Sequence, residues 1–161
     1  MQISISSRPR YFQKMIAHTK AIDLESAEKT DFIDVTEDVM SVVSGSGLKN
    51  GIVNIYTKHT TTSIRINENE EGLIDDLKRF LESKAPQFKT YVHDDIDRRK
   101  DVPVDEPANA HSHLKSILMG SSETIPLIKG CIELGTWQRI FFIDLDGPRK
   151  RKMIVHVVGE R

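Results

Sequence analysis

The chain has 161 residues, 38% of them hydrophobic and 29% charged, which suits one globular domain and argues against a disordered chain. Its net charge of −1 gives no general attraction to nucleic acid or to membranes, and we expect neither as a partner. The single cysteine excludes an internal disulfide framework, and the lack of a membrane-length apolar run or a signal-peptide pattern predicts a cytoplasmic protein.

The first part of the chain predicts a lead-in, a strand and a helix. We expect residues 1–10 to be flexible and residues 11–161 to form a single domain. An irregular alternation of apolar residues predicts a first strand over 11–23. Valines recur at helical spacing over 36–43, so we expect a helix there with Thr36 as its N-terminal cap.

The middle of the chain predicts two strands, a helix and a long loop. The apolar, β-branched stretch 51–56 predicts a central strand, and the alternating stretch 58–67 predicts a second strand paired with it. Apolar residues with helical period predict an amphipathic helix over 70–83. The charged, proline-containing stretch 94–107 predicts a long loop of the kind that is often functional. Residues 114–119 suit either a short helix or a strand.

The segment 120–142 combines glycines, serines, a proline and the only tryptophan with short apolar runs. We interpret it as two tight strands joined by a turn, with polar side chains that suggest a site. Cys131 lies in an apolar run, so we expect a buried, inert thiol. Strand patterns cover 123–128, 131–134, 138–144 and 153–158. The order of elements predicts an α+β fold, with a largely antiparallel sheet or sandwich and two or three helices.

Alternate residues of the predicted strand over 58–67 form one wholly polar face, which contains a base, a cation and an amide. Its members are His59, Thr61, Ser63, Arg65 and Asn67. The opposite face carries isoleucines and is expected to meet the core. The polar face is either a binding site or the solvent-facing side of an edge strand, since such faces are common in antiparallel sheets.

The chain has six histidines, and three imidazoles around an open position are a familiar catalytic metal arrangement. In an extended segment, His111 and His113 would present both rings on one face. A chance pair on the surface explains the same spacing, so the pair alone does not establish a metal site.

A third candidate is a phosphate-binding turn. Lys115 and Ser116 precede a glycine and two serines at 120–122, and hydroxyls with backbone amides near a glycine hold phosphate groups in other proteins. The chain has no Walker pattern and no GxGxxG, so this is not a standard nucleotide loop. A serine-rich turn is the alternative. Together with the histidines, these groups suit a phosphorylated or anionic substrate and a divalent metal.

These segments contain short motifs in a specific order. One series comprises Ser122, Ile125, Leu127, Gly130, the Gly-Thr-Trp-Gln of 135–138, and Ile140. The others are the His-Thr-Thr of 59–61, the Asn-Glu-Asn of 67–69, the Tyr-x-His of 91–93, the His-x-Lys of 113–115 and the Gly-Ser-Ser of 120–122. In these motifs the chain resembles the YjbQ-like family, whose members are described as secondary thiamine-phosphate synthases. The resemblance runs from about residue 15 to residue 160, nearly the whole chain.

The resemblance implies an α+β, sandwich-like fold and a homotrimer with sites near subunit boundaries. It also implies a divalent metal, zinc or magnesium, bound by His59, His93 and His113. The implied activity joins a pyrimidine diphosphate to a thiazole phosphate and releases pyrophosphate. The chain departs from the commoner pattern in the charged loop before His113 and at 144–149, which leaves the native substrate open.

Taking the residues and the resemblance together, we assign hypothetical roles to individual residues. The catalytic candidates are His59, Glu68, His113 and Gln138. The candidates for holding substrate or phosphate are Asn67, Lys115, Ser121, Ser122 and Arg139. Two other functions would use the same residues. One is a metal-dependent hydrolase of a small phosphorylated or amide substrate, and the other is a trimeric, non-catalytic accessory protein that binds a metal or ligand.

Overall fold

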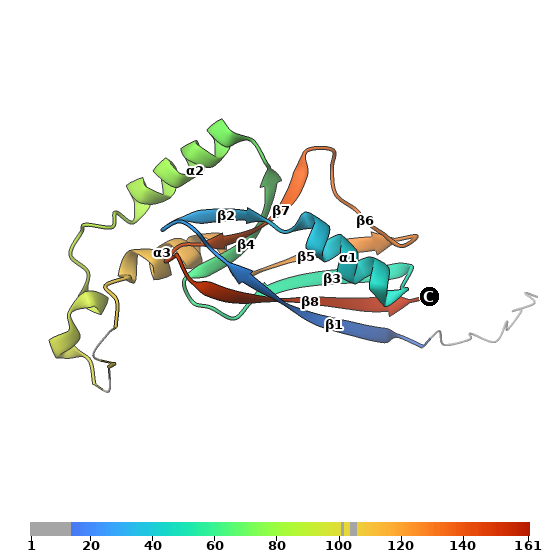
Figure 1. Cartoon of the computed structure of the whole chain (residues 1–161), viewed down its shortest axis with the longest axis horizontal. Coiled ribbons are helices and arrows are strands. Elements are labelled where there is room, and N and C mark those ends of the chain that lie inside the picture. The colour runs from blue at the N-terminus through green and yellow to red at the C-terminus, as the bar shows by residue number, and fades with distance from the viewer. Residues whose placement is uncertain (1–13, 101, 104–105) are drawn as a thin grey trace, which may run out of the picture.

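The structure, a computed structural model, describes residues 14–100, 102–103 and 106–161. Its described residues form a five-stranded sheet and a three-stranded sheet, together with three α-helices (Figure 1). Every strand pair in both sheets is antiparallel. The predicted α+β fold with largely antiparallel sheets is therefore confirmed. The expected flexible lead-in, 1–10, lies outside the described residues.

The five-stranded sheet has the order β1-β8-β3-β5-β6. Its strands are β1 (Ile16–Glu25), β8 (Lys150–Glu160), β3 (Asn50–Thr57), β5 (Ser122–Ile128) and β6 (Cys131–Ile132). In the interior strand β8, which lies between β1 and β3, buried residues such as Met153 and Val155 alternate with more exposed ones, as expected for a sheet with one covered face. The covered face packs against α1 (Thr36–Ser46) and the second sheet, and together they form the main hydrophobic core.

The three-stranded sheet has the order β2-β7-β4 and is buried on both faces of its middle strand. Its strands are β2 (Asp31–Asp34), β7 (Gln138–Asp144) and β4 (Thr62–Glu68). Ile140 and Phe142 of β7 belong to the main core, whereas Phe141 and Ile143 belong to a second cluster. Alternate residues of a strand point to opposite faces, so this sheet is the middle layer of the molecule.

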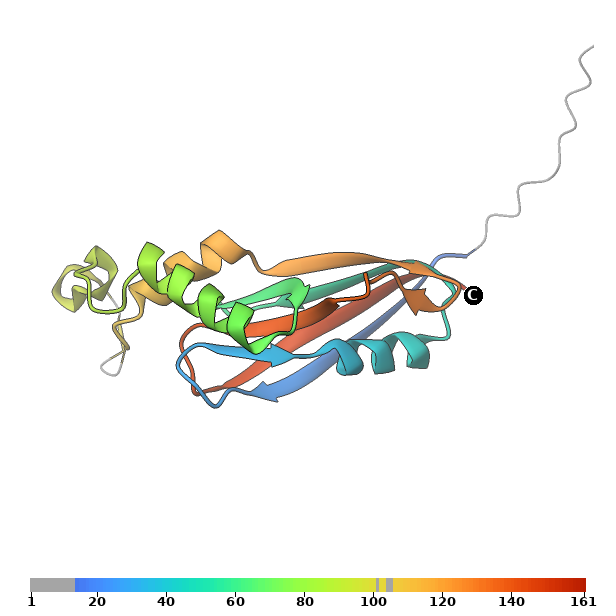
Figure 2. The ribbon, with the colours of Figure 1, turned by 90° about the horizontal axis from the view of Figure 1, so that it is seen from above.

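Two helices lie on the outer side of this middle layer. Leu81 and Ile74 of α2 (Glu71–Lys84) join the second cluster, as does Met119 at the end of α3 (Ala110–Met119). Between these helices the chain forms two short 3₁₀ turns, Val92–Asp94 and Ile96–Arg98. Figures 1 and 2 show α3 and the two turns at the end of the sheets opposite the C-terminus. The expected long loop over 94–107 corresponds to the second turn and irregular chain, apart from the residues that the structure leaves undescribed.

The cap of α1 differs from the prediction. Val35 occupies the N-cap position, and the carboxylate of Asp34 accepts hydrogen bonds from the amide and the hydroxyl of Thr36, at 3.0 and 2.7 Å. The Thr36 hydroxyl in turn accepts the amide of Ile140 at 2.8 Å. The prediction of Thr36 as the cap was therefore wrong, because a buried contact to β7 uses its hydroxyl and the aspartate before it satisfies the helix end.

The predicted pairing of 51–56 with 58–67 was also wrong. Residues 58–61 form a turn, and β4 begins only at Thr62 and pairs with β7 in the other sheet. The chain therefore crosses between the sheets at this turn, where the hydroxyls of Thr57 and Thr62 lie 2.5 Å apart. Ser63 and Ile64, which point to opposite faces, are both fully buried, so neither face of β4 at this end is open to solvent.

The segment 120–142 forms three strands, which agree with the strand patterns over 123–128, 131–134 and 138–144 and not with the interpretation of the segment as two strands joined by a turn. Strands β5 and β6 make a hairpin, in which Lys129 and Gly130 have positive φ angles of 52° and 85°, and β7 then enters the other sheet. Cys131 is exposed on the hairpin, so the buried-thiol prediction was wrong. Trp137, in the turn before β7, is 71% exposed.

Candidate functional site

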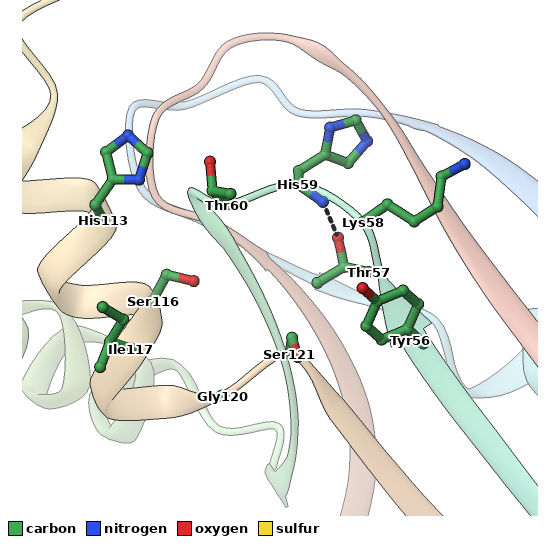
Figure 3. A pocket seen from close by; sticks show the side chains of 10 residues that line it. All are labelled: Tyr56, Thr57, Lys58, His59, Thr60, His113, Ser116, Ile117, Gly120 and Ser121. Carbon is green, nitrogen blue, oxygen red and sulfur yellow. Dashed lines mark hydrogen bonds between the residues drawn. The ribbon is translucent and has the colours of Figure 1, made fainter.

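A pocket with a volume of about 370 Å³ lies where β3 ends, β4 begins and α3 meets β5. Its walls are Tyr56, Thr57, Lys58, His59, Thr60, His113, Ser116, Ile117, Gly120 and Ser121, and we refer to it as the histidine pocket. Figure 3 shows His113 on α3 at one side and His59 with Lys58 at the other. The structure thus brings together four predicted residues, His59, His113, Ser116 and Ser121.

The turn between β3 and β4 positions His59. Its Nε2 atom accepts a hydrogen bond from the main-chain amide of Lys152 at 3.0 Å. Its own amide donates to the Thr57 hydroxyl at 3.3 Å, and its carbonyl accepts the Thr62 hydroxyl at 3.1 Å. Since an accepting Nε2 carries no proton, the neutral ring bears its hydrogen on Nδ1, which remains a donor.

A buried ion pair lies against this turn and holds it in place through Thr61. Arg151 donates two hydrogen bonds to the Asp144 carboxylate, both at 2.8 Å, and a third to the Thr61 hydroxyl at 3.1 Å. Ser26 donates a further hydrogen bond to Asp144 at 2.7 Å. Arg151 and Asp144 are 8% and 0% exposed, so the geometry of this bidentate pair is fixed by packing. Thr61, held in this way, lies two residues after His59.

His113 contacts His93, which lies in the first 3₁₀ turn. The two rings meet edge to face with centroids 4.8 Å apart. Both residues also line a second cavity of about 340 Å³, so His113 lines both this cavity and the histidine pocket. The Nε2 atom of His93 is buried and has no hydrogen-bond partner among the described residues. At this pair two imidazoles therefore lie together, and the Nε2 atom of His93 remains available to a ligand.

The surroundings of both pocket histidines favour the neutral form of the ring. Burial lowers the pKa of His59, and the nearby Arg151 lowers it further. Burial likewise lowers the pKa of His113, with a smaller contribution from His93. Neutral imidazoles can act as bases, as hydrogen-bond donors and acceptors, or as metal ligands.

His111 does not join the pocket. Because residues 110–119 are helical rather than extended, His111 and His113 point roughly 200° apart around the axis. The expectation that they share a face was wrong for this reason. His111 is 2% exposed, and its Nδ1 atom has no hydrogen-bond partner within the described part of the chain. Burial, and next Lys115, lower its pKa.

The predicted metal ligands are only partly assembled. In the ranges that the structure describes, no group of three or more His, Cys, Asp or Glu side chains is arranged to hold a metal ion. His93 and His113 lie together, whereas the Nε2 atom of His59 is already used by Lys152.

The predicted phosphate ligands near α3 occupy different places. The Lys115 ammonium is buried and forms an ion pair with Glu82 of α2 at 2.7 Å. The Ser116 hydroxyl donates to the carbonyl of Thr62 at 2.8 Å, which fixes α3 against β4. Ser121 lines the histidine pocket, and Ser122 begins β5 opposite Tyr56. Lys58, which the sequence reasoning missed, is the lysine of the pocket wall; its position next to His59 was the available signal.

The remaining candidates lie at the far end of the middle sheet. Thr62 faces Asp144 at the pocket end of β4, and Glu68 faces Gln138 at the other end. Six residue steps of a strand span about 20 Å, so one chain does not bring Asn67, Glu68, Gln138 and Arg139 to the histidine pocket. Arg139 donates to Asp34 at 2.8 Å, and the Gln138 side-chain oxygen accepts the amide of Gly135 at 2.7 Å.

Comparison with known proteins explains the agreement of the motifs. The sequence profile described as UPF0047 protein YjbQ-like matches residues 20–160. The chain belongs to this YjbQ-like UPF0047 family. A UPF0047 protein of Methanothermobacter thermautotrophicus is 41% identical over 146 residues, which cover 91% of this chain and 95% of that protein. The UPF0047 protein YugU of Bacillus subtilis is 30% identical and covers 87% of this chain and 98% of its own.

Solved structures of YjbQ-like proteins share the fold. A YbjQ-like protein of Sulfolobus solfataricus superimposes with a TM-score of 0.83 at 33% identity, and the match covers 91% of this chain and all of that one. A yjbq/upf0047 family protein of Clostridium acetobutylicum gives a TM-score of 0.76 at 34% identity, with 86% and 98% covered. The chain thus shares its overall fold with these two proteins.

Proposed function

We propose that this YjbQ-like protein is a transferase that binds phosphorylated small molecules in the histidine pocket. The reaction we propose is that of a thiamine-phosphate synthase: a pyrimidine diphosphate and a thiazole phosphate are joined, and pyrophosphate is released. One observation carries the proposal. The pocket wall contains a lysine, two histidines and several hydroxyls, but no carboxylate. Such a wall attracts anions and leaves no fixed negative charge to repel a phosphate.

Several donors of the pocket are free to meet a ligand. Among the described contacts, the side chains of Tyr56, Lys58, Thr60 and Ser121 make no hydrogen bond or ion pair within the protein. Figure 3 shows the Thr60 hydroxyl between His59 and His113. We assign Lys58 and the Nδ1–H of His59 to the diphosphate oxygens, with Ser121 and Thr60 as neutral donors.

The proposed reaction mainly requires stabilisation of the leaving pyrophosphate. The bond between the methylene carbon of the pyrimidine and the diphosphate oxygen breaks, and its electron pair leaves with pyrophosphate. The thiazole nitrogen supplies the electron pair of the new bond to the same carbon. Lys58 and His59 would lower the barrier by binding the charge that develops on the leaving oxygen.

We also propose that His93 and His113 hold a divalent ion, zinc or magnesium. The buried, unused Nε2 of His93 and the neutral state of His113 fit a metal ligand. A bound ion would supply further positive charge for the diphosphate. His59 was also predicted as a ligand, but the hydrogen bond from Lys152 favours its role as a donor to the substrate.

The assay supplies purified protein with both thiamine precursors, with and without added metal. The proposal expects thiamine phosphate and pyrophosphate in equal amounts, and a loss of product in Lys58→Met and His113→Ala. His18→Ala, on β1 and away from the pocket, is the matched control. Product at background level under all conditions, or full activity in both pocket variants, would overturn the proposal.

A metal-dependent hydrolase is the second candidate, and the neutral His113 favours it. In this function His113 would be a general base toward water instead of a metal ligand, since its lowered pKa leaves the imidazole unprotonated at neutral pH. Release of phosphate from a panel of simple phosphoesters, without coupling of the two precursors, would favour this function. Stoichiometric metal binding without any turnover would instead favour the accessory, ligand-binding protein.

We further propose that the protein is a homotrimer. Large apolar side chains are exposed on α2, α3 and the segment between them, as is unusual for an isolated domain. They are Phe80, Phe88, Val92, Ile96, Leu114, Ile117 and Leu118. Ile117 also lines the histidine pocket, so an interface here would lie beside the site. Light scattering that gives the mass of three chains would support the trimer, and the mass of one chain would contradict it.

A further inference from the structure

A second polar pocket lies at the opposite end of the middle sheet, where β2 and β4 end and β7 begins. Its volume is about 490 Å³, and its walls are Asp34, Glu68, Asn69, Glu70, Thr136, Trp137 and Arg139. We refer to it as the Trp137 pocket. It shares no residue with the histidine pocket, and the two lie about 20 Å apart along β4.

Trp137 is the unusual member of this pocket. Its side chain is 71% exposed although tryptophan is usually well buried, and among the described contacts its indole N–H has no acceptor. An indole face beside a polar cavity offers a stacking surface, and it attracts cations because its electron density is negative over the ring.

The charges of the pocket also favour a cation as its ligand. Asp34 and Glu37 both contact Arg139, at 2.8 and 3.4 Å, so the single cation of the pocket is already neutralised. Glu68 is exposed and has no ion-pair partner within the described residues. Glu70 accepts the amides of Gly72 and Leu73 at the start of α2 and is held in place by them. Negative charge therefore remains for a ligand.

We propose that the Trp137 pocket binds a small organic cation that carries an alkylammonium group. The ammonium group packs against the indole face, and the carboxylate of Glu68 is its counter-ion. Glu70 contributes to the same field from a fixed position. This site does not rest on the proposed function, because within one chain none of its residues lines the histidine pocket.

The single tryptophan makes the test direct, since all indole emission comes from this pocket. Choline is titrated into the full-length protein at low ionic strength, and tryptophan emission is recorded. Its uncharged isostere, 3,3-dimethyl-1-butanol, is titrated in parallel. We expect a saturable change with choline between roughly 0.1 and 10 mM, and at least about fivefold weaker binding of the alcohol.

Two variants test whether choline binds in the Trp137 pocket. Glu68→Gln should weaken choline binding by roughly two- to fivefold, because an exposed counter-ion is lost. Glu133→Gln, which removes an exposed carboxylate outside the pocket wall, should leave the affinity unchanged. Broadening of the choline methyl signal in proton NMR provides a readout that does not need the indole, and Trp137→Leu should abolish it.

Three results would overturn the proposal. They are no saturable signal by either method, equal responses to choline and to the alcohol, and a stronger response to phosphate that Glu68→Gln does not weaken. The last result would identify Arg139 as an anion ligand. His113→Ala should bind choline normally, so failure of the proposed transferase activity and failure of this inference remain distinguishable.

Discussion

The Nε2 atom of His59 accepts the main-chain amide of Lys152 at 3.0 Å, and this contact decides what the ring can offer to a ligand. A backbone amide cannot change its donor character, so Nε2 stays unprotonated as long as the contact holds. The neutral ring then presents an N–H at Nδ1. His59 is therefore suited to donate a hydrogen bond to an anion, whereas His93 retains a buried nitrogen without a partner.

Metal binding should distinguish these histidines. His93→Ala and His113→Ala should each weaken zinc binding by more than the roughly 10- to 100-fold that the loss of an outer-shell partner costs. His59→Ala should change it less than either. Calorimetric titration of the purified protein with zinc measures all three. An effect of His59→Ala as large as that of His113→Ala would restore His59 as a ligand.

Stability should fall as the pH drops below neutrality. His59, His111 and His113 have a lowered pKa in the folded protein, mainly through burial. The unfolded chain takes up protons near pH 6.5, where the folded chain does not, so acid favours unfolding. The free energy of unfolding should be nearly constant above pH 7.5 and should decrease between about pH 7 and 5.5.

His111→Gln tests the source of that pH dependence. His111 lies near Lys115, Lys29, Asp146 and Glu82, and it is the most buried of the three histidines. Its replacement by a side chain that does not titrate should reduce the slope of stability against pH in urea unfolding series. An unchanged slope would show that His111 is not a source of the acid sensitivity.

The buried ion pair under the histidine pocket should be costly to break. Arg151→Met leaves the Asp144 carboxylate buried without its guanidinium and should lower the free energy of unfolding by about 3–5 kcal/mol. Lys78→Met, which breaks the partly exposed pair with Glu28, is the matched control and should cost about 0–1 kcal/mol. Chemical denaturation compares them, and equal costs would contradict the structural role of Arg151.

Much of the fold could be predicted from the sequence because the strands and helices follow strong apolar patterns. The valines of α1 and the helical period of α2 gave both helices to within a few residues. The pairing of β4 could not be predicted. Its alternation suits either sheet, and the choice depends on the crossing of the chain at 58–61, which no local pattern specifies.

The candidate site was predictable only where its residues come from neighbouring elements. His59 and Ser121 meet because β3 pairs with β5, and α3 adds His113. Gln138 and Arg139 belong to the same motif region in sequence, yet β7 carries them to the far end of the middle sheet. Closeness in sequence was a poor guide here, because an extended strand separates its ends by about 3.3 Å per residue.

Two lysines show how the phosphate site predicted from the sequence differs from the site in the structure. Lys58 lines the histidine pocket and has no carboxylate partner among the described residues, whereas Lys115 is buried against Glu82. Lys58→Met should therefore weaken pyrophosphate binding by about tenfold or more, because a charged hydrogen bond is lost. Lys115→Met should lower the stability and leave the pyrophosphate affinity within about twofold, since its ammonium is committed to joining α2 and α3.

Calorimetric titration with pyrophosphate, paired with thermal unfolding of each variant, measures both effects. A loss of pyrophosphate affinity in Lys115→Met, in protein that is still folded, would return the phosphate role to Lys115 and contradict the assignment to Lys58.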